Sequence, residues 1–257
     1  MIQAFKLTTN NIGTKMRVYL FQIDDILLDT GPSSVGQEVR RIFKELTIKQ
    51  VIHTHHHEDH TGNSPWIENN YNIPQWIHPL GVKHCEKATK LPLYRAVVWH
   101  NRKPFHPQAL ESSYVQTTSH LLKIVHTPGH AEDHIVLIDE EKGICFTGDL
   151  YLHHAPTSNF SFESVPEIIR SIDKTLKYRF KDVYCSHRGY IQGGRKLLEQ
   201  KRDYLLGLQE QVIHAYHRGN SVKQIRKDLF PKNGPIQYAS FLENSPIHTV
   251  NSIIQGL

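Results

Sequence analysis

The sequence has few cysteines and no long apolar run. Its three cysteines, Cys85, Cys145 and Cys185, lie far apart in 257 residues, and three thiols cannot all pair within one chain. That usage favours a reducing compartment over a disulfide scaffold. No stretch reaches the roughly 18 apolar residues that a membrane span needs, and the first residues lack the basic and apolar regions of a secretory signal. We therefore expect a cytoplasmic protein without a membrane segment.

Several catalytic motifs are missing as well. The chain has no G-x-S-x-G serine-hydrolase turn, no phosphate-binding P-loop and no dinucleotide-binding glycine pattern. Serine-hydrolase and nucleotide-dependent chemistries therefore have no support. The abundant residue is histidine, with 19 copies in a chain of net charge +5. Because histidine is the commonest metal-ligand side chain, the clustering of these residues decides the function.

Strand-like runs and helical patterns alternate along the first 190 residues. Ser164 and Glu167 form a capping-box pattern ahead of apolar residues at helical spacing, which predicts a helix there. The stretch 91–107 carries prolines, aromatics and basic residues without a clear period, so we expect a cap loop. Beyond Gly194 the pattern is helical to the end of the chain, with breaks near Gly219 and between Pro231 and Pro235. Strands are expected within residues 16–31, 49–54, 121–126, 134–139, 143–149 and 182–187, with helices at 35–46 and after Pro79.

The segment His55-His56-His57-Glu58-Asp59-His60 fits H-x-H-x-D-H. In an extended chain, side chains two residues apart point the same way, so His55 and His57 can bind one ion. The side chain of His56 points away. Asp59 and His60 come where the chain turns toward a helix, so they can face a second ion. The spacing therefore predicts a site for two metals rather than one.

Three later candidates each follow a predicted strand. Thr127-Pro128-Gly129 forces a turn that presents His130, Asp149 offers a carboxylate that can bridge two cations, and His187 ends the run from Asp182. Loops on a rigid scaffold are where such sites are usually assembled. Nitrogen and oxygen ligation without thiolate suits zinc, and also iron or manganese.

The order H-x-H-x-D-H, T-P-G-H, G-D and a final strand-terminal histidine resembles the metallo-β-lactamase-fold hydrolases, over about residues 16–190. The resemblance implies an α/β fold, an αββα sandwich with the metals at one edge of its two sheets. It implies a core over 1–190 and a helical C-terminal extension over 191–257. It also implies that His55, His57 and His130 hold the first ion, that Asp59, His60 and His187 hold the second, and that Asp149 bridges both.

Two positions qualify the resemblance. True zinc β-lactamases generally carry cysteine where this chain has Asp149, which favours the branch of glyoxalase II, other thioesterases and lactonases. The last ligand usually lies in a P-G-H-G-like turn, whereas here the sequence is Cys185-Ser186-His187-Arg188-Gly189. Arg188 would then place a charge beside the metal edge, where it could bind substrate.

The expected chemistry is attack on a carbonyl by a hydroxide held between two divalent ions, which acidify bound water. Asp59 would orient that hydroxide and pass its proton to the leaving group. Tyr151 is a candidate hydrogen-bond donor to the substrate carbonyl or a packing residue. Asp29 and His134 are candidate supports of the metal ligands, with a turn cap and a turn histidine as the alternatives. Tyr94, Arg95, Trp99, Arg102 and Phe105 either line a substrate cap or simply pack.

Three functions compete. The first is hydrolysis of a small thioester, ester or lactone, in which the basic segment 188–232, with local charge +6 from ten basic and four acidic residues, holds an anionic carrier such as glutathione or coenzyme A. The second is a nuclease or phosphodiesterase acting on RNA, because the tail is similar in kind to that of β-lactamase-like endoribonucleases. The third is a non-catalytic metal-binding protein. A long amphipathic tail also allows a homodimer.

Overall fold

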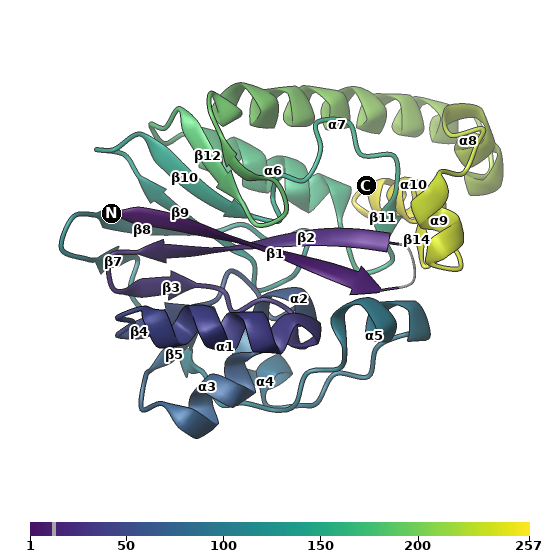
Figure 1. Cartoon of the computed structure of the whole chain (residues 1–257). Coiled ribbons are helices and arrows are strands. Elements are labelled where there is room, and N and C mark those ends of the chain that lie inside the picture. The colour runs from purple at the N-terminus through teal and green to yellow at the C-terminus, as the bar shows by residue number, and fades with distance from the viewer. Residues whose placement is uncertain (12–13) are drawn as a thin grey trace.

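Two six-stranded sheets form the centre of the molecule (Figure 1). The computed structural model describes residues 1–11 and 14–257. The first sheet has the order β1 (Ile2–Asn11), β2 (Thr14–Ile23), β3 (Ile26–Leu28), β4 (Gln50–Ile52), β5 (Gln75–Ile77) and β6 (Gln108–Ala109). The second has the order β13 (Gly189–Ile191), β12 (Asp182–Cys185), β10 (Ile144–Gly148), β9 (Ile135–Asp139), β8 (Leu121–His126) and β7 (Tyr114–Gln116). The short strands β11 (Asn159–Phe160) and β14 (Asn244–Ser245) pair separately.

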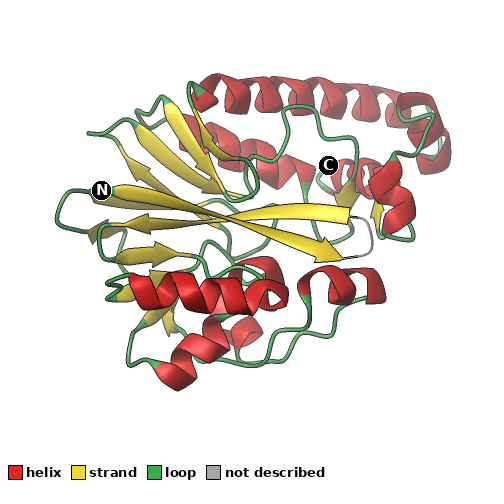
Figure 2. Ribbon diagram, in the orientation of Figure 1, coloured by secondary structure: helices red, strands yellow, loops and turns green. Residues whose placement is uncertain are grey.

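Helices cover the outer faces of both sheets (Figure 2). Those of the first half are α1 (Gly36–Glu45), α2 (Glu58–Thr61), α3 (Ser64–Asn70), α4 (Pro79–Cys85) and α5 (Leu93–Trp99), with a 3-10 turn at Ser33–Val35. Those of the second half are α6 (Val165–Leu176), α7 (Gly194–His217), α8 (Val222–Leu229), α9 (Pro235–Ala239) and α10 (Pro246–Gln255). No helix in the part of the chain that the structure describes is long and apolar enough to cross a membrane.

The side-chain alternation of the strands explains why there are two layers of helices. Successive residues of a strand point to opposite faces, so Phe21 packs between the sheets while its neighbour Leu20 packs outward against α1. On the other sheet Phe146 faces the first sheet, and Cys145 faces α6 and α7. Both faces of each sheet are therefore apolar and covered. The predicted αββα sandwich is confirmed.

The local predictions held in most places, but β1, β5, β6, β7, β11, β13 and α3 had no sequence prediction, and two segments differ from theirs. The helix over 35–46 appears as α1, and the Ser164 hydroxyl caps α6 by accepting from the Glu167 amide at 3.4 Å. The segment 91–107 is not all loop, because it contains α5. The tail is not purely helical, because β14 interrupts it. The strand β1 had no sequence prediction, and it forms the edge of the first sheet by pairing along β2.

Candidate metal centre

Five segments bring the predicted metal ligands to one place. His55 and His57 follow β4, and Asp59 and His60 begin the short helix α2. The remaining three come from the second sheet: His130 from the turn between β8 and β9, Asp149 directly after β10, and His187 between β12 and β13. The side chains form two groups in which the ligand atoms lie within 4.8 Å of one another, His55, His57 and His130 in the first, and Asp59, His60, Asp149 and His187 in the second.

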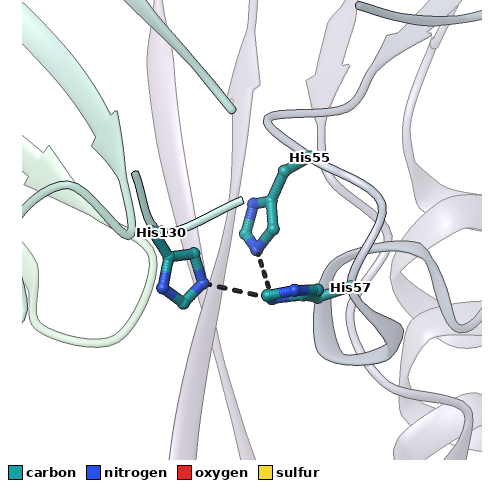
Figure 3. A group of neighbouring side chains, drawn as sticks. All are labelled: His55, His57 and His130. Carbon is teal, nitrogen blue, oxygen red and sulfur yellow. Dashed lines mark hydrogen bonds between the residues drawn. The ribbon is translucent and has the colours of Figure 1, made fainter. Parts of the chain in front are cut away.

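The first group presents three imidazole nitrogens to a common point. His55 Nε2 lies 3.0 Å from His57 Nδ1, and His130 Nε2 lies 3.1 Å from the same atom (Figure 3). Burial lowers the pKa of both His55 and His57 well below the ordinary value, and the neighbouring histidines lower it further. Both rings are therefore neutral at physiological pH, with lone pairs available to a cation.

The second group is built around the carboxylate of Asp149. Its Oδ2 lies 3.3 Å from His187 Nε2, and its Oδ1 lies 3.5 Å from His60 Nε2. Asp59 Oδ2 also lies 3.3 Å from His187 Nε2. Asp149 reaches the first group too, because its Oδ2 is 3.4 Å from His130 Nε2. One carboxylate thus stands between the two groups.

Hydrogen bonds on the far side of the rings fix which nitrogen faces inward. The Nδ1 of His60 donates to Asp29 Oδ2 at 2.8 Å, that of His130 to Glu163 Oε1 at 2.6 Å, and that of His187 to the Arg17 carbonyl at 2.8 Å. In a neutral ring the other nitrogen then carries the lone pair. Such outer partners orient metal-binding histidines and set their tautomer.

The electrostatics of the second group favour positive charge. Burial alone would lower the pKa of His60, but the carboxylates of Asp149, Asp29 and Asp59 raise it well above the ordinary value. Burial would likewise raise the pKa of Asp149, but His187 and His60 hold it well below its usual range. These carboxylates pull protons onto the rings, and a bound divalent cation would take the place of those protons.

The residues present fit divalent metal ions. His60 Nε2 and Asp149 Oδ1 are buried and have no hydrogen-bond partner among the described residues. Buried polar atoms are nearly always paired, so two unpaired atoms facing each other point to a ligand between them. The donor set of nitrogen and carboxylate oxygen suits zinc, iron or manganese.

The predicted supports, Asp29 and His134, both contact the site. Asp29, in the left-handed region at φ 61°, accepts from the Thr54 amide at 2.8 Å in addition to His60. His134 Nε2 accepts from the backbone amide of Asp149 at 3.0 Å, so its Nδ1 carries the proton and donates to Thr127 at 2.8 Å. Burial lowers the pKa of His134 to about 3, which keeps it neutral and able to accept.

The two predicted substrate contacts lie in different surroundings. Tyr151 is only 4% exposed and packs in the core formed by the second sheet and α6, which is the packing alternative considered from the sequence. Arg188 is exposed on the turn after His187. Among the other histidines, His56 points away from the ligands as expected and its Nδ1 contacts Asp133 Oδ1 at 2.7 Å.

A cavity of about 610 Å³ opens beside the first group. His57 forms part of its wall, and the ring of Phe162 stands across His57 with centroids 5.4 Å apart. Arg95 and Arg102 of the predicted cap segment line it, whereas Phe105 is buried in a small core with Ile77 and Cys85. Arg95 and Arg102 therefore contribute to the cavity wall, and the packing alternative holds for Phe105.

Sequence reasoning missed Glu163. It stands in the loop between β11 and α6, accepts from His130, and also accepts from the Phe160 amide at 2.8 Å. No local motif marks it, because its partner is 33 residues away. The capping box one residue later fixes the start of α6 and is the only nearby signal.

Comparison with known families defines the class of protein. The model of the Metallo-beta-lactamase superfamily matches residues 24–187, and the chain belongs to this superfamily. Solved structures agree on the fold. A metallo-beta-lactamase family protein from Thermus thermophilus superposes with a TM-score of 0.69 at 18% identity, covering 99% of this chain and 92% of the other. A beta-lactamase domain protein from Burkholderia ambifaria gives 0.73 at 18% identity, covering 98% and 86%.

The curated relatives carry several different names. A beta-lactamase-like protein 2 homolog of Drosophila melanogaster is 27% identical, covering 65% of this chain and 56% of its own. An atrochrysone carboxyl ACP thioesterase of Aspergillus fumigatus is 24% identical, covering 76% and 55%. A hydroxyacylglutathione hydrolase of Aliivibrio fischeri is 23% identical, covering 69% and 63%. The chain thus spans little more than half the length of the first two.

Proposed function

We propose that this protein is a dinuclear metal-dependent hydrolase that cleaves a thioester, ester or lactone. The observation that carries the proposal is the position of Asp149. Its Oδ2 lies 3.4 Å from His130 Nε2 in one group and 3.3 Å from His187 Nε2 in the other. A shared carboxylate is what two neighbouring cations need from a bridging ligand. His55 and His57 complete the first group, and Asp59 and His60 complete the second.

The chain's own residues supply the ligands and a proton acceptor. Two bound divalent ions, zinc by donor chemistry with iron or manganese as alternatives, would lower the pKa of water and polarise a carbonyl. Burial would raise the pKa of Asp59, but His60 and His187 lower it, so this carboxylate is ionised. We assign Asp59 the role of orienting the attacking water and carrying its proton to the leaving group.

Support for carbonyl substrates comes from the relatives. Two of them carry names that denote thioester hydrolysis, an ACP thioesterase and a hydroxyacylglutathione hydrolase. Asp149, in place of a cysteine ligand, agrees with that branch. Cys185, two residues before the last ligand, is buried, and its thiol donates to the Tyr151 carbonyl.

The test combines metal content with turnover. We expect close to two transition-metal ions per purified chain, and hydrolysis of an acyl thioester that Asp59→Ala and Asp149→Ala each reduce by more than about 100-fold. Asp173→Ala, which removes a surface carboxylate of α6, is the matched control and should leave turnover unchanged. Single-stranded RNA and bis-p-nitrophenyl phosphate belong in the same panel. Faster cleavage of either than of any carbonyl substrate, or full activity in both site variants, would overturn the proposal.

A further inference from the structure

The cavity beside His57 has an excess of positive charge that no side chain of the described residues neutralises. Two carboxylates line it together with four residues of fixed positive charge. Glu58 forms a bidentate ion pair with Arg95, and Glu132 contacts His84 Nε2. Lys87 and Lys90 also line the cavity, and neither has an ion pair or a hydrogen bond from its ammonium group within residues 1–11 and 14–257. Two lysines without a charged partner therefore line the same cavity.

The loop that carries these lysines is fixed in place by Arg102. This side chain is 1% exposed, and its guanidinium donates to the carbonyls of Cys85 and His84 at 2.8 and 2.9 Å. Its backbone exchanges two hydrogen bonds with Thr89, whose amide donates to the Arg102 carbonyl and whose hydroxyl accepts from the Arg102 amide. Because four hydrogen bonds hold residues 84–89, the lysine side of the cavity is a built wall rather than a loose loop.

The cavity also has an apolar lining and reaches the first histidine group. Phe162, Leu91 and Ala131 line it, and the ring of Phe162 packs on His57. The cavity thus combines two lysines, an apolar surface and His57 of the first histidine group. A molecule that fits this combination carries an anionic group, an apolar part and a reacting carbonyl.

We infer that Lys87 and Lys90 bind the anionic part of the substrate, so that the substrate is a thioester or ester whose leaving group bears carboxylate or phosphate. This inference rests on the proposed hydrolase function. It also moves the anion site away from the basic segment 188–232, because no described residue of that segment lines the cavity. Carboxylate and phosphate share the chemistry that an ammonium group recognises, and the substrates below separate them.

The kinetic test compares three thioesters of the same acyl group. S-acyl glutathione carries carboxylates, acyl coenzyme A carries phosphates, and the N-acetylcysteamine thioester is neutral. In Lys87→Gln/Lys90→Gln we expect KM for at least one anionic thioester to rise about tenfold or more, with kcat unchanged. KM for the neutral thioester should change by less than about twofold. The anionic thioester whose KM rises most identifies the carrier.

The control removes the same charge from the basic segment. Lys223→Gln/Lys227→Gln alters two exposed lysines of α8, so a general loss of electrostatic attraction would affect both double variants equally. The inference fails if the α8 variant shows the larger rise in KM. It also fails if KM rises equally for all three thioesters in Lys87→Gln/Lys90→Gln.

A binding measurement separates this inference from the proposed function. Titration calorimetry with S-methylglutathione and with desulfo-coenzyme A uses probes that lack a thiol and need no turnover. We expect the wild-type protein to bind one of them with an affinity that falls with salt, and Lys87→Gln/Lys90→Gln to weaken it about tenfold or more. Absence of binding to the wild type overturns the inference whatever the activity. Binding without hydrolysis of any thioester overturns the proposed function and leaves the anion site standing.

Discussion

Arg95 of α5 holds Glu58, the residue between His57 and Asp59, in a bidentate ion pair. The guanidinium nitrogens lie 2.8 and 2.9 Å from the two carboxylate oxygens, and the side chains are 13% and 3% exposed. The same guanidinium stands 5.9 Å from the ring centre of Phe162. The helix α5 is therefore attached to the loop that carries the candidate metal ligands, and not only to the surface around it.

Replacing Arg95 should lower the free energy of unfolding. Arg95→Met leaves the Glu58 carboxylate buried without its partner, and breaking such a pair costs about 3 kcal/mol of unfolding free energy. The double variant Glu58→Gln/Arg95→Met removes both charges and should lose distinctly less unfolding free energy than Arg95→Met. Urea unfolding of the three proteins measures the difference. A single variant that loses under about 1 kcal/mol would show that the pair contributes little.

Asp29→Asn should weaken metal binding. The variant loses a charged acceptor for His60 Nδ1, and changes to such outer partners typically cost roughly 10- to 100-fold in affinity. The chain offers a closely matched control in Asp139, which accepts from His120 Nδ1 at 2.8 Å and from the Lys142 amide at 2.9 Å. Asp139→Asn should leave affinity unchanged in a competition with a zinc chelator. Equal effects of the two variants would assign Asp29 to folding alone.

Glu163 should act through its acceptor oxygen. Glu163→Ala removes the partner of His130 Nδ1, so we expect at least about tenfold weaker metal binding. Glu163→Gln keeps an oxygen that can accept from the same nitrogen and should restore part of the affinity. Chelator competition measures both. If the glutamine variant is as weak as the alanine variant, the carboxylate charge rather than the hydrogen bond matters.

Lys201 makes stability depend on pH in the alkaline range. This residue of α7 is 5% exposed, and its ammonium donates to the Leu150 carbonyl at 2.7 Å. Burial lowers its pKa from 10.5 to about 8. Between these values the unfolded chain binds more protons, so stability should rise with pH from about 8 to about 10.5, by roughly 3 kcal/mol.

The rise of stability with pH should disappear when the Lys201 amine is removed. Unfolding midpoints in urea at pH 7.5, 9 and 10 would be compared for the wild type, Lys201→Met and Lys196→Met, an exposed lysine on the same helix. Only Lys201→Met should flatten the profile. A flat wild-type profile would mean that Lys201 titrates at its ordinary pKa.

The metal residues could be predicted because their signals are local. His55, His57, Asp59 and His60 lie within six positions, and the three later ligands each follow a strand that its apolar run reveals. The αββα fold was implied by the family resemblance that these motifs carry. Sequence spacing could not predict hydrogen bonds between residues far apart in the chain. Glu163 is the clearest case, because only the folded loop brings it to His130.

The missed elements have related causes. The strand β1 is an edge strand with several exposed residues, so its alternation is weak and its pairing with β2 decides its structure. The helix α5 has only seven residues and follows Pro92, and a helix that short depends on tertiary contacts such as Arg95 with Glu58. Neither could be settled from propensity.

The apolar cluster behind the second sheet has a consequence for how much of the chain is needed to fold. Val136, Cys145 and Val183 of the strands share that cluster with Leu198 of α7 and Val250 of α10. The superfamily match stops at residue 187, so a fragment trimmed to that boundary would keep α6 but lose α7 and α10, and would expose much of this cluster to water. Truncation at the match is thus expected to yield an insoluble product, not a minimal enzyme.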